Sequence, residues 1–228
     1  MNEKAISATV IRRLPRYYRY LSELLENDVE RISSKELSDR MNVTASQIRQ
    51  DFNNFGGFGQ QGYGYNVKYL HSEIGKILGL EKTHNVVIVG AGNLGQALAK
   101  YQDFPKRGFK IIGIFDIDPK KIGMKIGGVE VKNMAELENF IKDNDVDIAA
   151  ITLPKEPAPA IAAALAELGV KAIWNFAPTD LHLEKDVIVE NVHLLESLMH
   201  VSYRLADRER GDDDDDDDDD DDEDEDDD

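Results

Sequence analysis

Residues 86–101 read VVIVGAGNLGQALAKY, an apolar strand pattern that runs into three glycines and then into a helical pattern. Each glycine has its own physical reason: Gly90 permits a tight turn, Gly92 lets the backbone approach a pyrophosphate, and Gly95 allows close packing of helix on strand. The N-terminus of the following helix favours anions because its N–H groups and its dipole point toward the turn. The stretch therefore predicts a dinucleotide-binding βαβ unit.

A second predicted strand, residues 111–115, ends in Asp116, roughly 20 residues after the last glycine of the turn. A carboxylate at this place accepts hydrogen bonds from both ribose hydroxyls of adenosine and repels a 2′-phosphate. This position favours NAD(H), as NADH and NAD⁺, over NADP(H). The plainer alternative is a surface aspartate that happens to end a strand.

The alternation of strands and helices continues along the chain. Further strands are expected at residues 128–131, 148–152, 171–175 and 187–190, and helices at residues 134–142, 157–168 and 194–210. Such alternation is typical of α/β folds with a mainly parallel sheet. We therefore predict a Rossmann dinucleotide-binding domain over residues 81–193.

Ligands of open α/β sheets bind at the carboxyl ends of the strands, so residues there are candidates for the nicotinamide side. Thr152 and Asn175 offer hydrogen bonds and Phe176 an apolar wall, although ordinary loop chemistry would also place such residues there. The predicted cofactor-binding residues from the turn and the strand ends are Gly90, Ala91, Gly92, Asn93, Leu94, Gly95, Asp116, Ile117, Thr152, Pro154, Asn175, Phe176 and Ala177.

Upstream of this domain, two short helices are each opened by a capping box. Ser33 is followed three residues later by Glu36, and Thr44 by Gln47. The second helix is expected to end near Phe55, with Gly56 as its stop. Two capped helices across a tight turn predict a helix-turn-helix over part of residues 1–80.

On the second of these helices, Ile48, Phe52 and Phe55 form an apolar stripe, and polar side chains lie opposite. Five glycines within residues 56–64 then predict the wing of a winged helix, which can approach a DNA backbone closely. The alternatives are a merely solvated helix face and a plain helix stop. The predicted DNA-binding residues are Arg12, Arg16, Ser46, Gln47, Arg49, Gln50, Asn53, Gly59, Gln60 and Gln61.

The formal charge of −18 seems to argue against DNA, but residues 212–228 are all acidic and account for nearly all of it. Such a run of like charges is expected to be a disordered tail. The first twenty residues hold five cations against the single acid Glu3. Because local charge decides what a surface binds, DNA binding stays open.

Composition excludes several other classes of site. The chain has no cysteine, its five histidines lack metal-ligand spacing, and it contains no 18-residue apolar run. We therefore expect a cytoplasmic protein with no metal site and no membrane partner.

A catalytic role is also disfavoured. A dehydrogenase needs a proton donor and a substrate pocket, and the chain after Asn175 leaves little room for either. His182, His193 and His200 are not flanked by an orienting carboxylate in any recognisable motif. No catalytic residue is predicted, and a ligand-gated DNA-binding protein is favoured. A small enzyme using NAD(H) or coenzyme A, and a scaffold whose nucleotide is structural, remain as alternatives.

This combination resembles the Rex family of redox-sensing transcriptional repressors. The stretches that carry the resemblance are RLPRYYRYL (13–21), ISSKELSDRM (32–41), QIRQDFNNFGGFGQQGYGY (47–65), VVIVGAGNLGQALAKY (86–101), FDIDPKKIG (115–123), NFAP (175–178) and IVENV (188–192). The resemblance implies a homodimer with exchanged C-terminal helices, here residues 194–211. It also implies that NADH binding releases a palindromic operator, whereas NAD⁺ permits operator binding.

The resemblance further implies a switch in which an aspartate exchanges between Arg19 and Tyr101, and Tyr101 also contacts the cofactor. This chain has His193 at the aspartate position, which changes the possible ion pair with Arg19. It also has Gln50 where a lysine commonly follows the recognition-helix arginine. Leu194 stands where some relatives place an aromatic residue against the partner's nicotinamide.

Overall fold

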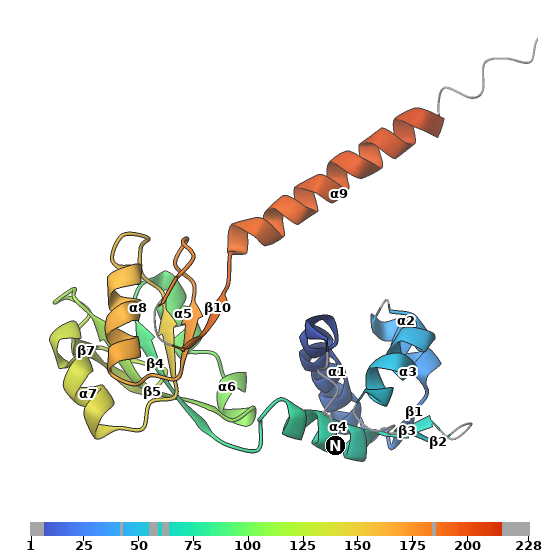
Figure 1. Cartoon of the computed structure of the whole chain (residues 1–228), viewed down its shortest axis with the longest axis horizontal. Coiled ribbons are helices and arrows are strands. Elements are labelled where there is room, and N and C mark those ends of the chain that lie inside the picture. Colours follow the sequence, from blue (N-terminus) through green and yellow to red (C-terminus); the bar gives the residue numbers. More distant parts are fainter. Residues whose placement is uncertain (1–6, 42, 55–58, 61–63, 184–185, 216–228) are drawn as a thin grey trace, which may run out of the picture. The chain divides into compact units, whose positions relative to one another are not determined.

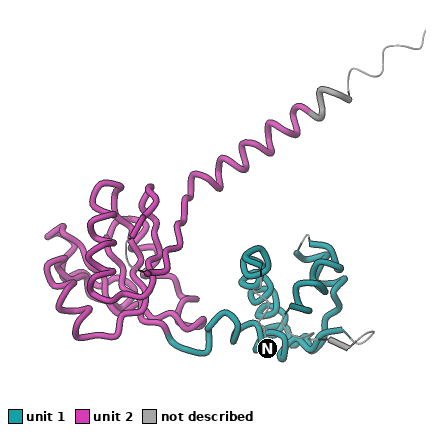
Figure 2. The backbone as a smooth tube through the Cα atoms, viewed as in Figure 1, with its two compact units in different colours: residues 1–83 teal, residues 84–228 magenta. Residues whose placement is uncertain are grey.

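The computed structural model describes residues 7–41, 43–54, 59–60, 64–183 and 186–215. The chain forms two compact units, residues 1–83 and 84–228, which Figure 2 colours separately. Each unit has its own buried apolar core. The boundary between the two units follows Thr83, three residues after the end of the predicted N-terminal domain.

The first unit combines helices with a small antiparallel sheet in the strand order β1-β3-β2 (Figure 1). Its elements are α1 (Ala8–Glu26), β1 (Arg31–Ile32), α2 (Ser34–Met41), α3 (Ala45–Asn53), β2 (Gly59–Gln60), β3 (Gly64–Asn66) and α4 (Val67–Ile77). Apolar side chains from all four helices meet in the core, among them Leu14 and Leu21 of α1, Leu37 of α2, Ile48 and Phe52 of α3, and Leu70 of α4. This is the predicted winged helix.

Local hydrogen bonds explain where the helices of the first unit begin. The Ser33 hydroxyl accepts a bond from the Glu36 N–H at 3.1 Å, and the Glu36 carboxylate accepts one from the Ser33 N–H at 2.7 Å. The Thr44 hydroxyl accepts a bond from the Gln47 N–H at 3.2 Å. The capping box at Ser33 and the cap at Thr44 are confirmed. The predicted stop at Phe55 and Gly56 lies outside the described residues.

The predicted wing is a pair of short strands, β2 and β3, paired antiparallel. Gly64 has a φ of 69°, and a Cβ there would lie 2.8 Å from the carbonyl oxygen of Ile32. Only glycine therefore fits at this position, where β3 begins beside β1. The tip between the two strands, which includes Gln61, is outside the described residues.

The second unit is built on a seven-stranded sheet in the order β10-β9-β8-β4-β5-β7-β6. Its elements are β4 (His84–Val89), α5 (Asn93–Ala99), α6 (Asp103–Lys106), β5 (Phe109–Asp116), β6 (Lys125–Ile126), β7 (Val129–Asn133), η1 (Met134–Glu136), α7 (Leu137–Asp143), β8 (Ile148–Ile151), α8 (Ala158–Glu167), β9 (Ala172–Asn175), β10 (Ile188–Asn191) and α9 (Leu194–Asp215). All pairs are parallel except β6 with β7. β6 was not predicted from the sequence, because a two-residue edge strand is too short to show periodicity.

Alternate residues of the strands face opposite layers, as the pleat requires. Val87 and Val89 of β4 pack with α7 and α8, whereas Val86 and Ile88 pack on the side of α5. After β4 the chain adds β5 and β7 on one side of it, and then crosses to the other side to add β8, β9 and β10. This central position is the topological switch point at which such sheets bind ligands.

The helix α9 begins at Leu194, as predicted, and continues past Arg210 into the first residues of the acidic run. Most of its large apolar side chains are more than half exposed: Leu194, Leu195, Leu198, Met199, Val201, Tyr203 and Leu205. An exposed apolar series of this length indicates an interaction surface.

None of the helices in the described part of the chain is long and apolar enough to cross a membrane.

Candidate nucleotide and DNA-binding sites

The glycine turn lies between β4 and α5 and forms one wall of a cavity of about 620 Å³, the dinucleotide cavity. Predicted residues from the turn and from three other strand ends meet in this cavity. Those that line it are Gly90, Gly92, Asn93, Leu94, Asp116, Ile117, Thr152, Pro154 and Phe176. Residues far apart in the sequence are thus brought together as the fold class requires.

The three glycines of the turn differ in what surrounds them. Gly90 has a φ of 105°, and a Cβ on Gly95 would lie 2.0 Å from the Gly90 carbonyl oxygen. A Cβ on Gly92 would meet nothing within 4 Å. Gly90 and Gly95 are therefore required by the turn itself, whereas Gly92 leaves open space for a ligand to approach.

Thr152 braces this turn from the end of β8. Its hydroxyl donates to the Gly90 carbonyl at 2.7 Å and lies 3.2 Å from the Val89 carbonyl. The hydroxyl proton is thus used within the protein. Toward a ligand, the Thr152 oxygen is left as an acceptor.

Asp116 ends β5 and is only 8% exposed. One carboxylate oxygen accepts bonds from the Ala91 N–H at 2.6 Å and from the Lys121 ammonium at 3.2 Å, and the other from the Asp118 N–H at 2.8 Å. Burial acts to raise the pKa of Asp116, but these donors outweigh it and hold that pKa below its usual value. An ionised carboxylate with remaining acceptor capacity therefore faces the cavity.

Several residues of the cavity wall were not predicted from the sequence. Lys121, 29% exposed at its side chain, adds a cation beside Asp116. Its signal was its place in FDIDPKKIG, five residues after Asp116. The apolar residues that were missed are Phe115, Met134, Leu153, Pro157 and Ile161.

Other predicted cofactor residues lie behind the cavity wall. Asn175 is fully buried, and its amide nitrogen donates to the Thr179 carbonyl at 2.7 Å and to the Asn191 side chain at 2.8 Å. Its oxygen accepts from the Ala177 N–H at 3.0 Å. Both amide protons are thus used to hold the loop, so Asn175 has none left to donate to a ligand. Ala91, Gly95 and Ala177 also support the site without lining the cavity.

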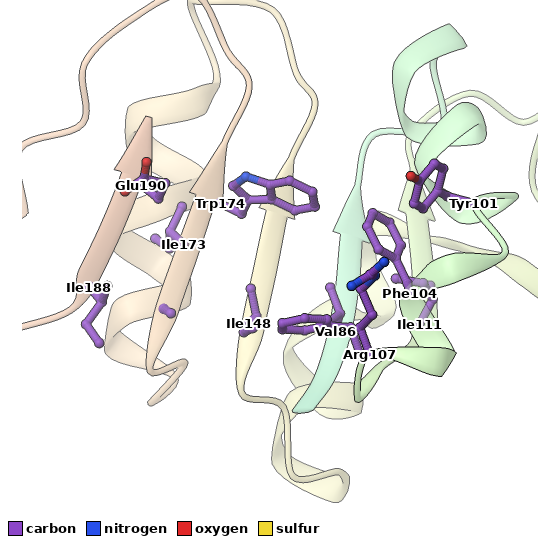
Figure 3. A pocket seen from close by; sticks show the side chains of 12 residues that line it. Val86, Tyr101, Phe104, Arg107, Ile111, Ile148, Ile173, Trp174, Ile188 and Glu190 are labelled. Carbon is purple, nitrogen blue, oxygen red and sulfur yellow. The ribbon is translucent and has the colours of Figure 1, made fainter. Parts of the chain in front are cut away.

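Tyr101 lies in a second cavity of about 440 Å³, here called the apolar groove, which Figure 3 shows over the strands from β5 to β10. Its lining is mostly apolar, with Arg107 and Glu190 as charged members. The ring centroids of Tyr101 and Phe104 are 4.8 Å apart, and those of Phe104 and Trp174 are 5.8 Å apart. Trp174 in turn contacts Phe176 of the dinucleotide cavity at 4.6 Å. A row of aromatic rings therefore connects the two cavities.

The remaining switch residues each have a partner within their own unit. The His193 ring nitrogen Nε2 lies 3.0 Å from a carboxylate oxygen of Asp180. The Arg19 guanidinium lies 5.1 Å from the centre of the Tyr20 ring. The switch itself stays a prediction.

In the first unit, α3 presents Ser46, Arg49, Gln50 and Asn53 as exposed side chains. Ile48 and Phe52 are buried on the opposite side, as predicted. Arg12 and Arg16 are exposed on α1. Gln47 differs from its predicted neighbours, because its amide nitrogen donates to Asp51 at 2.8 Å inside the unit.

A winged helix with an exposed polar helix face, joined to a dinucleotide cavity, defines the class of nucleotide-responsive DNA-binding proteins. Family models agree with this division: "Putative DNA-binding protein N-terminus" matches residues 5–53, and "CoA binding domain" matches residues 81–179. The chain is 60% identical to the redox-sensing transcriptional repressor Rex of Caldanaerobacter subterraneus subsp. tengcongensis, over 92% of this chain and 94% of that relative. It is 58% identical to Rex of Clostridioides difficile, over 91% and 99% of the two chains. The chain belongs to the Rex family of redox-sensing transcriptional repressors.

Solved structures match most of the chain. The Rex-family repressor RSP has been solved in complex with β-NAD⁺ and operator DNA, with a TM-score of 0.84 at 60% identity, covering 90% of this chain and 95% of that one. RSP in complex with β-NADH gives a TM-score of 0.82 at 57% identity, covering 90% and 97%.

Proposed function

We propose that this chain is a repressor that binds a palindromic operator as a homodimer when NADH is scarce and releases it when NADH binds. The observation that carries this proposal is the presence of both sites on one chain whose relative RSP is known with β-NAD⁺ plus operator DNA and with β-NADH. Family members are transcriptional repressors, and repression acts on chromosomal DNA, so the proposal places the chain in the cytoplasm.

In the dinucleotide cavity, the pyrophosphate would lie over Gly92, where a Cβ would have open space. The first N–H groups of α5 have no partner within the helix and can donate to phosphate oxygens. Asp116 would accept hydrogen bonds from the ribose hydroxyls, with Lys121 beside it. Phe176, at the end of β9, would lie on the nicotinamide side. Bound in this way, the nucleotide would place its nicotinamide, the part that differs between NADH and NAD⁺, beside Phe176.

For DNA, we assign α3 as the recognition helix. Arg49 suits the acceptors of guanine, and Gln50 and Asn53 suit adenine. Arg12 and Arg16 of α1 would contact phosphates, which position the protein without reading sequence. Gly59 and Gln60 of β2 would let the wing approach the backbone. Gln50 makes one contact of this helix neutral where the family commonly has a lysine.

The dimer would form by exchange of α9. The apolar series on α9 and the apolar groove on the sheet are complementary in character, and each is exposed on the single chain. In a symmetric pair, α9 of each copy would cover the groove of the other. Tyr101 lies in that groove, which brings the predicted switch tyrosine to the dimer interface.

We also propose that the bound nucleotide is not turned over. The charged residues that line the cavity, Asp116 and Lys121, are both assigned to the ribose, and the relatives are transcriptional repressors. Incubation of NADH with the protein and small carbonyl substrates should leave NADH absorbance constant. Steady turnover would instead favour an enzyme.

The test starts from random duplex DNA, from which the protein with NAD⁺ selects its operator. The selected sequence should have two-fold symmetry, and NADH should release it at least tenfold more effectively than NAD⁺. NADPH serves as the control nucleotide. Selection of no consensus sequence, or equal binding with both redox forms, contradicts the proposal.

A further inference from the structure

The recognition helix α3 carries a carboxylate, Asp51, that is fully buried. Arg13 donates to it twice, from Nε at 2.6 Å and from Nη2 at 2.7 Å. The Tyr17 hydroxyl donates at 2.8 Å, and the Gln47 amide nitrogen donates at 2.8 Å. Four donors therefore converge on one carboxylate, here called the Asp51 cluster.

Burial of an isolated carboxylate is unfavourable, so the charge state of the Asp51 cluster matters. Burial acts to raise the pKa of Asp51, but the bonds from Arg13, Tyr17 and Gln47 outweigh it and lower that pKa. Burial and the bond to Asp51 raise the pKa of the Tyr17 hydroxyl. At neutral pH the cluster is a carboxylate paired with a guanidinium and a neutral phenol.

The Asp51 cluster links α1 and α3, and each helix contributes two residues to it. Arg13 and Tyr17 lie one turn apart on α1, and Gln47 and Asp51 lie one turn apart on α3, so each pair shares a helix face. The bidentate contact of a guanidinium with a carboxylate has a fixed planar geometry. Apolar contacts alone, such as the ring contact of Tyr17 with Phe52 at 4.9 Å, allow more sliding and rotation. The cluster therefore fixes the rotation of α3 about its own axis.

This rotation decides where the exposed face of α3 points. Arg49, Gln50 and Asn53 lie close to Asp51 in sequence but on exposed faces of the helix. A small rotation would move their side chains away from the base edges, whereas contacts to phosphates tolerate more movement. Sequence-specific binding should be more sensitive to the cluster than binding to random DNA.

We propose that Asp51 is a positioning residue for operator recognition, which sets the rotation of α3 through its pairing with Arg13, Tyr17 and Gln47. The proposal rests on the proposed function, in which α3 reads the operator. It also reassigns Gln47, predicted as a DNA contact, to the support of the helix. Arg13 also supports α3, through its two hydrogen bonds to Asp51.

The test compares Asp51→Asn with wild type in the full-length protein. Dissociation constants are measured at one salt concentration for the selected operator, for random duplex and for NADH. The ratio of operator to random affinity should fall at least tenfold, and the NADH constant should change less than twofold. Asp39→Asn is the matched control, because it removes an exposed carboxylate from α2 and changes the net charge equally. An unchanged ratio in Asp51→Asn, or an equal fall in Asp39→Asn, overturns the proposal.

A merely structural role gives a different result, because partial unfolding lowers affinity for operator and random DNA by the same factor. If Asp51→Asn is unfolded at the assay temperature, Tyr17→Phe takes its place, since it removes one donor and keeps the ring. It should lower the ratio about threefold, and an unchanged ratio overturns the proposal. Absence of operator preference in the wild type would instead contradict the proposed function itself.

Discussion

The two units each bury one carboxylate next to their predicted site, and the two carboxylates differ in how they are satisfied. Asp51 receives four hydrogen bonds from side chains of α1 and α3 and has no exposed surface. Asp116 receives bonds from two backbone N–H groups and from Lys121, and it lines a cavity. A carboxylate saturated by protein donors positions its helix, whereas one that faces a cavity can bind a ligand.

The largest effect is expected from a change in the glycine turn, whose Ala91 N–H binds Asp116. This change should affect the second unit and leave the first unit unaltered. A Cβ on Gly95 would lie 2.0 Å from the Gly90 carbonyl oxygen, so Gly95→Ala should displace the turn and weaken NADH binding at least 100-fold. Thermal unfolding of the second unit should shift downward, and that of the first unit should not.

Gly92→Ala is the control for this prediction, because its Cβ has open space within the protein. It should weaken NADH binding while the second unit unfolds at the wild-type temperature. Equal unfolding temperatures for Gly95→Ala and wild type would contradict the packing account of the turn.

The second largest effect is expected from the Asp51 cluster, which should make a pH-dependent contribution to the free energy of unfolding of the first unit. Folding lowers the pKa of Asp51 from an unfolded value of about 3.9, so its stabilisation is present above that pH and is lost as pH falls through the folded-state pKa. Asp51→Asn should lower the free energy of unfolding of the first unit at pH 7 by about 2 kcal/mol, or roughly 30-fold in the equilibrium constant.

The measurement is urea unfolding of the first unit at pH 7 and at steps below pH 4. The variant should lose part of the wild-type slope with pH in this acidic range. A variant whose stability follows the wild-type pH curve would show that Asp51 is not ionised in the folded protein.

Asp116 should show a smaller effect that concerns selectivity. Asp116→Ala removes the proposed acceptor for the ribose hydroxyls and the charge that would repel a 2′-phosphate. The affinity for NADPH relative to NADH should therefore rise about tenfold, on the order of 1.4 kcal/mol. Lys121→Ala should change the ratio in the opposite direction, because the cation beside Asp116 is lost. Calorimetric titration with both nucleotides measures the ratio of NADPH to NADH affinity. An unchanged ratio in both variants would show that Asp116 and Lys121 do not contact the ribose.

The smallest effect concerns the aromatic row between the cavities. Trp174 is the only tryptophan, and its ring contacts Phe176 of the dinucleotide cavity. NADH absorbs where tryptophan emits, so saturating NADH should partly quench the emission, whereas NAD⁺ should not quench by this route. Unchanged emission at saturation would move the nicotinamide away from Phe176.

Features that depend on neighbours in sequence could be predicted from the sequence. The glycine turn, the capping box at Ser33 and the cap at Thr44 each involve residues a few positions apart, and local steric or hydrogen-bonding rules are enough to identify them. Asp116 was found for a related reason, because the strand that follows the turn places it at a fixed edge of the sheet.

Features that depend on residues far apart could not be predicted. Arg13 and Asp51 are 38 positions apart, and no local pattern distinguishes a paired arginine on α1 from its exposed neighbours. The same holds for Asn175, whose partner Asn191 follows on the next strand. Asn175 was expected to contact the nicotinamide and no role was predicted for Arg13, whereas the folded chain uses both side chains to hold other groups in place.

We propose that occupancy of the dinucleotide cavity by NADH controls DNA binding by α3. It is tested most directly by titrating the selected operator with protein at a fixed total nucleotide concentration while the NADH/NAD⁺ ratio is varied. Operator binding should fall as the ratio rises, and Asp116→Ala should shift the ratio needed for release. Operator binding that is indifferent to the ratio would contradict this proposal.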